Sequence, residues 1–142
     1  QEDFDRVLEV IKNGNGDDRI RLVILTRLKR DWILNSASQR IDLKDLHITN
    51  QELWMISSIL RQSYSISTLI FEHCSLGDQE IGSIPDILRS SKTISHLNLA
   101  SNYIGDRGMK ILGMALNSNS SICELDLSSK RCLSPRLDCV VQ

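Results

Sequence analysis

The sequence predicts an α/β fold of stacked units, each made of a short parallel strand followed by a helix. Three observations support this prediction. Aliphatic residues recur with a period of 28 residues. At the start of each unit they alternate with polar residues, which buries one face of a strand. In the rest of the unit they are three and four residues apart, which buries one face of a helix.

Four units are visible, starting near residues 38, 66, 94 and 122. Each unit begins with two apolar residues that are two positions apart, as in a half-buried strand. These pairs are Ile41 and Leu43, Leu69 and Phe71, Leu97 and Leu99, and Leu125 and Leu127. Because a single unit cannot bury its apolar face alone, the units are expected to stack on one another.

The second half of each unit is predicted to be an amphipathic helix. The apolar helix positions are Leu53, Ile56, Ile59 and Leu60 in the first unit and Met109, Leu112, Ala115 and Leu116 in the third. Pro85 falls among the helix positions of the second unit, where it removes a hydrogen bond. The helix of that unit is therefore expected to begin late, near Ser83 or Ile84, or to kink.

Polar residues mark the expected helix starts. Thr49 with Glu52 three residues later predicts a capping box, in which each side chain bonds a backbone N–H group of the other residue. Asp78 and Asp106 are expected to cap the next two helices.

The pattern resembles that of leucine-rich repeats, and the 28-residue length with Gly105 and Gly108 is similar to the ribonuclease-inhibitor-like subfamily. The resemblance covers residues 38–132 and implies a right-handed solenoid. Neighbouring parallel strands are about 4.8 Å apart and packed helices about 10 Å, so such a stack curves. The strands are then expected on the concave side and the helices on the convex side.

The resemblance also implies that an asparagine or cysteine after each strand turns inward and bonds the backbone. Asn102 and Cys74 fit that position, whereas Leu46 and Lys130 depart from it. Since an inward lysine is costly, regular stacking is expected to end near Lys130.

The two ends of the chain do not follow the period. Residues 1–37 are predicted to form a helical N-terminal cap, and residues 133–142 an irregular tail. The chain begins with Gln1 rather than Met, so we expect a fragment or a processed form.

Composition and motifs favour binding over catalysis. The net charge of −1 gives no field that would attract nucleic acid or a membrane surface. None of the common catalytic or phosphate-binding motifs occurs, and the four cysteines lack zinc-ligand spacing. We therefore expect no enzyme activity, no cofactor, no metal and no small-molecule substrate. The cysteines are expected to be reduced thiols in an intracellular protein, whether cytoplasmic, nuclear or cytoskeletal.

The outward strand positions are the predicted protein-binding surface, because side chains alternate between the two faces of a strand. These candidate residues are Arg40, Asp42, Lys44, Thr68, Ile70, Glu72, His73, His96, Asn98, Glu124 and Asp126. Ile70 is the large apolar residue among them and a candidate anchor for a partner.

The leading functional hypothesis is a protein-interaction scaffold that binds a partner protein through the concave face. Three further hypotheses stay open. The first is a GTPase activator, because the resemblance includes Ran GTPase-activating proteins and Arg107 follows the predicted strand in the expected loop. The second is a cytoskeletal or ciliary assembly factor, and the third is the sensor fragment of an innate immune receptor.

Overall fold

The computed structural model describes residues 39–63 and 65–128, and residues 5–6, 9, 12, 19, 21–24 and 26 nearer the N-terminus. Strands and helices alternate along the chain, which confirms the predicted α/β class. The elements are β1 (Gln39–Asp42), α3 (Asn50–Gln62), β2 (Ile66–Ile70), α4 (Asp78–Ile81), α5 (Ile84–Ser90), β3 (His96–Asn98), α6 (Asp106–Asn117) and β4 (Glu124–Asp126).

The four strands form one parallel sheet in the order β1-β2-β3-β4. Its register pairs Ile41 with Leu69, Leu69 with Leu97, and Leu97 with Leu125. Each partner lies 28 residues further along the chain, so the sequence period is the step from one strand to the next. The strand pairing derived from the period is thus confirmed.

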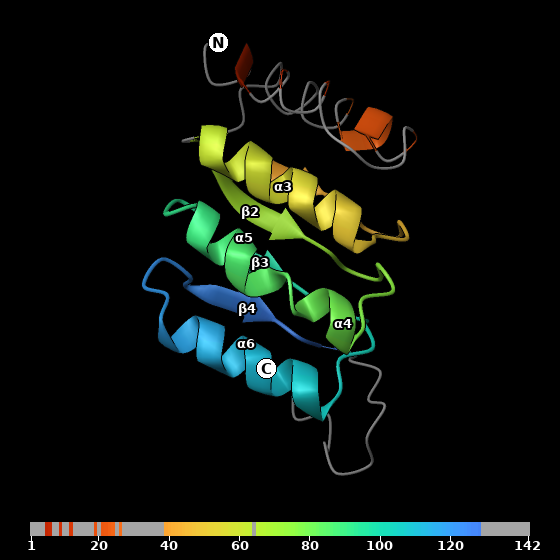
Figure 1. The fold of residues 1–142 in the computed structure, drawn as a ribbon, viewed down its shortest axis with the longest axis vertical. Coiled ribbons are helices and arrows are strands. Elements are labelled where there is room, and N and C mark those ends of the chain that lie inside the picture. Colours follow the sequence, from red (N-terminus) through yellow and green to blue (C-terminus); the bar gives the residue numbers. More distant parts are fainter. Residues whose placement is uncertain are drawn as a thin grey trace.

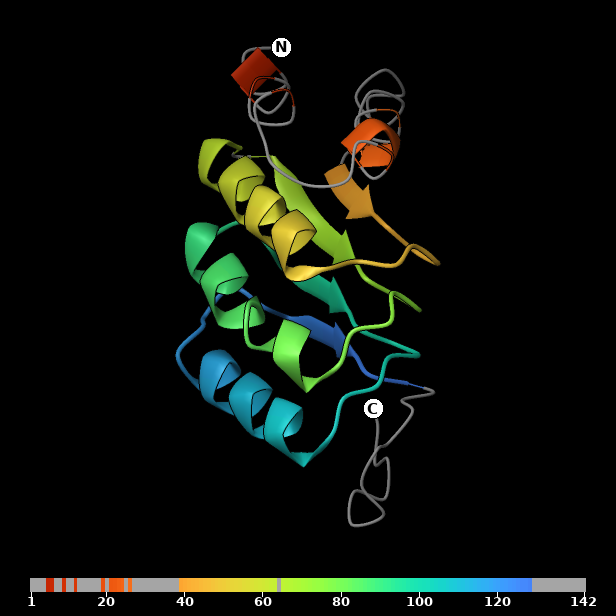
Figure 2. The same ribbon diagram turned by 45° about the vertical axis from the view of Figure 1, so that its right-hand side comes forward.

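The helices lie on one side of the sheet, and the core fills the space between the two layers (Figures 1 and 2). α3 packs against α5, while α4 and α5 both pack against α6. Leu69, Phe71 and Leu99 are fully buried beneath the helices. Burial of each such side chain contributes about 1.5–3 kcal/mol, so stacking of the units is the main source of stability.

The helix of the second unit is divided in two. α4 ends at Ile81, and α5 begins at Ile84 with Pro85 in its first turn. A proline is tolerated there because the first N–H groups of a helix have no intrahelical partner. The expected late start is therefore confirmed.

The expected helix caps are wrong in detail. The N-cap residues of α4 and α6 are Gly77 and Gly105, so Asp78 and Asp106 are the first helical residues instead. Thr49 does precede α3, but its hydroxyl donates to the Glu52 carboxylate and caps no backbone group. The acidic residues still lie in the first turn of each helix, where the helix dipole favours negative charge.

Asn102 turns inward and holds the bend after β3, as expected. Its Oδ1 accepts hydrogen bonds from the N–H groups of Cys74 and Leu76, both at 3.0 Å. Its Nδ2 donates to the carbonyl groups of Phe71 (2.8 Å), Leu99 (3.0 Å) and Ala100 (3.1 Å). Cys74 occupies the equivalent inward position one unit earlier, where its thiol donates to the carbonyl of Leu43 at 3.0 Å. These two buried side chains therefore tie neighbouring units together.

The predicted end regions are described only in part. In residues 1–37 the described residues are helical, Ile24 belongs to the buried core, and Arg6 Nε donates to the carbonyl of Gln62 at 3.1 Å. Lys130 and the tail 133–142 lie outside the described residues, so the domain boundaries stay predictions. Within the described part of the chain, no helix has the length and apolar character needed to cross a membrane.

Candidate protein-binding surface

The predicted candidate residues gather on the side of the sheet away from the helices, and we call them together the sheet face. All of them are exposed or half-buried. The register places them in rows across the strands. One row is Arg40, Thr68, His96 and Glu124, and the next is Asp42, Ile70, Asn98 and Asp126. Lys44, Glu72 and His73 lie just beyond the strand ends.

Ionisable side chains on and beside the sheet face pair across neighbouring units. Lys44 Nζ is 3.0 Å from Glu72 Oε2, and His96 Nε2 is 3.0 Å from Glu124 Oε2. His73 Nδ1 is 2.9 Å from Asp45 Oδ1. Exposed pairs of this kind add little stability. They leave acidic and basic side chains side by side on this surface rather than a patch of a single sign.

The second row is largely engaged by the backbone. Asp42, Asn98 and Asp126 each accept a hydrogen bond from the N–H group two residues later, at 3.0, 2.9 and 2.8 Å. These Asx turns end the strands. Ile70 takes the same position in β2 and has no polar group to make such a turn. It is therefore an apolar side chain, half-buried, in an otherwise polar row.

The alternation between the two faces of the sheet stops where β3 ends. Ala100 follows β3 at a position that alternation places outside, yet it is buried at 3% exposure. Its carbonyl accepts from Asn102 Nδ2 and from the N–H group of His73. The chain bends inward there, so strict alternation ends with the strand.

The Lys44–Glu72 pair gives a testable titration. The hydrogen bond to Glu72 raises the pKa of Lys44 above its ordinary value of 10.5, and the charges of Glu72 and Asp45 add to the effect. The pair therefore stabilises the fold below pH 10.5 and loses this contribution as the pH rises through the raised pKa. We expect Glu72→Gln to lower the pKa of Lys44 in an NMR titration of its side chain. Glu124→Gln, on the same face, should leave it unchanged, and equal shifts in both variants would contradict the pairing.

Among the residues that the structure describes, no three His, Cys, Asp or Glu side chains are grouped to hold a metal ion. Cys74 is a buried thiol and Cys123 an exposed one. Cys132 and Cys139 lie outside the described residues.

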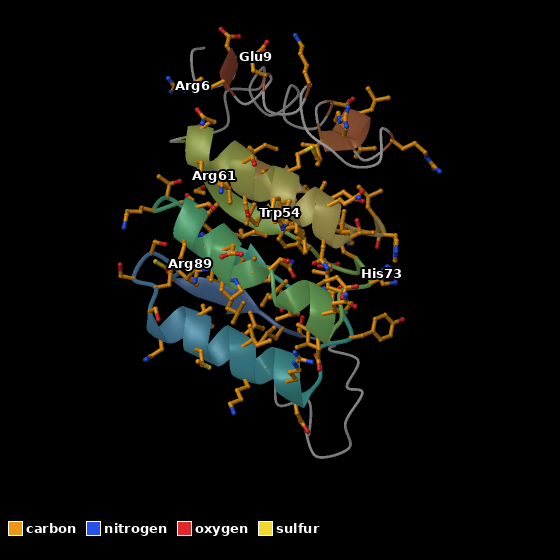
Figure 3. The ribbon with its side chains drawn as sticks, viewed as in Figure 1. Arg6, Glu9, Trp54, Arg61, His73 and Arg89 are labelled. Atoms are coloured by element: carbon orange, nitrogen blue, oxygen red, sulfur yellow. The ribbon has the colours of Figure 1, made fainter. Side chains whose placement is uncertain are left out.

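The helix layer exposes apolar side chains that were not predicted as candidates from the sequence. Trp54 on α3 is 74% exposed and Met114 on α6 is 66% exposed. A signal was present, because each falls at a helix position outside the buried stripe. Trp54 points away from the sheet, and Arg61 on α3 and Arg89 on α5 lie on the same outer side of the helix layer (Figure 3).

These observations define an α/β domain with a four-stranded parallel sheet, one open polar sheet face and helices on the other side. No family model matches the sequence, and no curated protein matches it. Solved structures do share its fold. A leiomodin-1 structure described as Actin-Binding Site 2 matches with a TM-score of 0.61 at 24% identity, over 77% of this chain and 64% of that one.

A second structure with this fold is the tropomodulin C-terminal domain of Caenorhabditis elegans. It matches with a TM-score of 0.58 at 15% identity, over 88% of this chain and 65% of that one. The chain thus spans a little under two thirds of the length of each structure. At these identities the likeness establishes the fold.

The comparisons correct the expected family. The assignment as a leucine-rich-repeat protein of the ribonuclease-inhibitor-like subfamily is wrong, since the structures that share the fold are a leiomodin and a tropomodulin domain. The physical reason is that a period of buried aliphatic residues reports only which side chains face the core. It predicts stacked strand–helix units correctly without distinguishing the families that use them.

Proposed function

We propose that this chain is a protein-binding domain of the cytoskeleton and that it binds actin through the sheet face. The observation that carries the proposal is the fold shared with the leiomodin-1 structure described as an actin-binding site. Among the functions expected from the sequence, this likeness favours the cytoskeletal assembly factor over the general scaffold. A cytoskeletal location and a role without catalysis are parts of the same proposal.

The GTPase-activator and immune-sensor hypotheses lack such support. A GTPase activator would need Arg107 in a loop, but Arg107 is the second residue of α6. Its exposed side chain projects from a regular helix. This position is less suitable than a loop for reaching into a partner's active site. No described feature favours an immune sensor.

The sheet face has the chemistry of a moderate-affinity interface. Interfaces commonly have a few apolar anchors surrounded by polar groups that exclude water. Ile70 supplies the apolar centre, and the Lys44–Glu72 and His96–Glu124 pairs lie on the same sheet face. The narrow sheet offers a limited contact area, so we expect a weak or moderate affinity from this chain alone.

Binding to purified actin tests the proposal. The whole chain would be titrated against monomeric actin by isothermal calorimetry and sedimented with filaments. Two sheet-face variants, Ile70→Asp and Glu124→Lys, are expected to weaken binding about tenfold or more. The matched control is Lys110→Glu, an exposed charge on α6.

Thermal unfolding followed by circular dichroism must show that each variant is folded. If Ile70→Asp fails to fold, Glu124→Lys decides, since its side chain is exposed. No binding of the wild-type chain to either form of actin would refute the partner. Binding that both sheet-face variants retain in full would refute the surface.

A further inference from the structure

The outer side of the helix layer carries a groove made of two adjoining hollows. The first, about 450 Å³ in volume, lies between α3 and α5 and is lined by Trp54, Arg61 and Arg89 among others. The second, about 680 Å³, lies between α5 and α6, and Arg89 and Met114 are among its lining residues. Arg89 lines both hollows, so they adjoin at this residue, and we call the two together the helix groove.

The helix groove has an apolar side chain in each hollow. Trp54 lines the first and Met114 the second, and the two are 74% and 66% exposed. Single exposed apolar residues are common on protein surfaces. Here two large ones each border a hollow of the same groove, and Ile111 adds a half-buried apolar wall to the second. Such hollows suit apolar side chains of a partner.

The charge of the helix groove is positive, although the whole chain has a net charge of −1. Arg61, Arg89 and Lys92 line it, against the single carboxylate of Asp86. Asp86 is paired with Arg89. Arg61 hydrogen bonds to the hydroxyl groups of Ser58 at 2.9 Å and Ser90 at 3.4 Å, so within the described part of the chain its contacts are hydroxyl groups rather than carboxylates.

We propose that the helix groove binds an acidic peptide segment that presents two apolar side chains, one to each hollow. The arginines would pair with carboxylates of the peptide between its two anchors, since guanidinium groups bind carboxylates with matched geometry. Among the described residues, Trp54 is the single aromatic one that lines the two hollows, and the second hollow offers aliphatic surface instead. This favours a peptide over a nucleic acid, whose successive bases need aromatic surfaces to stack on. This surface lies across the helix layer from the sheet face, so the proposal is independent of actin binding.

A peptide of glutamate and leucine is the probe. An 18-residue peptide with leucines three and four positions apart, and glutamates at the remaining positions, presents several anchor spacings at once. It would be titrated into the ¹⁵N-labelled whole chain, with the indole N–H signal of Trp54 followed by NMR. We expect saturable shifts confined to Trp54 and to the facing surfaces of α5 and α6.

Two matched peptides separate charge from apolar contact. Replacement of every glutamate by lysine, or of every leucine by alanine, is expected to weaken binding at least tenfold. Equal binding of the lysine peptide would overturn the charge argument. Tighter binding of an oligouridylate at the same residues would overturn the choice of a peptide.

Variants of the chain complete the test. Trp54→Ala, followed through the backbone amide signals of α5 because it lacks the indole, and Arg61→Glu are both expected to weaken binding of the glutamate–leucine peptide at least tenfold, because both side chains line the first hollow. Glu124→Lys on the sheet face is the matched control and should change the affinity less than twofold. Unchanged binding of Arg61→Glu, or shifts centred on the strands, would overturn the proposal while leaving actin binding untouched.

Discussion

Asn102→Ala is expected to lower the free energy of unfolding by about 3 kcal/mol, because it leaves buried backbone groups without partners. The N–H groups of Cys74 and Leu76 both donate to the Asn102 side chain. Asn102 has no exposed surface, so water cannot replace the lost amide without entering the core. Urea denaturation followed by circular dichroism measures the loss.

Asn98→Ala is the control for this prediction, since it removes the same amide group from the same unit. Asn98 is half-buried on the sheet face and bonds the N–H group of Ala100 and the Glu72 carboxylate. Because Asn98 and Glu72 are both half-buried rather than fully buried, water can take the place of the lost amide, and we expect a loss below about 1 kcal/mol. Similar losses for the two variants would show that Asn102 does not have the structural role assigned to it.

The strands were predictable because their signal is strong and local. Ile41, Leu69, Leu97 and Leu125 are buried or half-buried on one side of the sheet, and the polar residues that alternate with them face the other. A shift of one residue would expose the apolar set, so the pattern also determines the register. The inward position of Asn102 followed from the family resemblance, even though the family itself was wrong.

The helix starts were less predictable because a contact between units decides them. Asp78 was expected to cap its own helix, but its Oδ1 accepts from the N–H group of Gly105 at 2.6 Å, in the next unit. A side chain that bonds across 27 residues leaves no local pattern. Glycine takes both N-cap positions here, so the usual polar signal falls one residue late.

The sheet face and the helix groove also differ in how far the sequence predicts them. The residues of the sheet face could be predicted from the alternation along the strands alone. The helix groove depends on the distances between the outer surfaces of three helices. The spacing of residues within one helix does not determine those distances. Sequence could single out Trp54 and Met114 as exposed apolar residues, but it could not place them beside Arg89.

Gly108→Ala is expected to destabilise the fold by about 2 kcal/mol, although alanine favours a helix over glycine by about 1 kcal/mol. A Cβ atom at this position would lie 2.5 Å from Asp78 Oδ1 and 2.8 Å from Ile104 Cγ2. Ile104 is fully buried, and the Asp78 carboxylate is held by its bond to Gly105. Neither neighbour can move without loss of packing or of a hydrogen bond. Gly108 therefore allows the close approach of two units.

Gly113→Ala, in the same helix, has the opposite expected sign. A Cβ atom there would have no neighbour within 4 Å, so only the helix preference remains, and stability should rise by up to about 1 kcal/mol. Denaturation of both variants compares them directly. Asp78→Ala removes the nearest obstacle, so the combination with Gly108→Ala should cost less than the sum of the two single changes. Additive losses, or stabilisation by Gly108→Ala, would mean that Asp78 and Gly108 are not in contact.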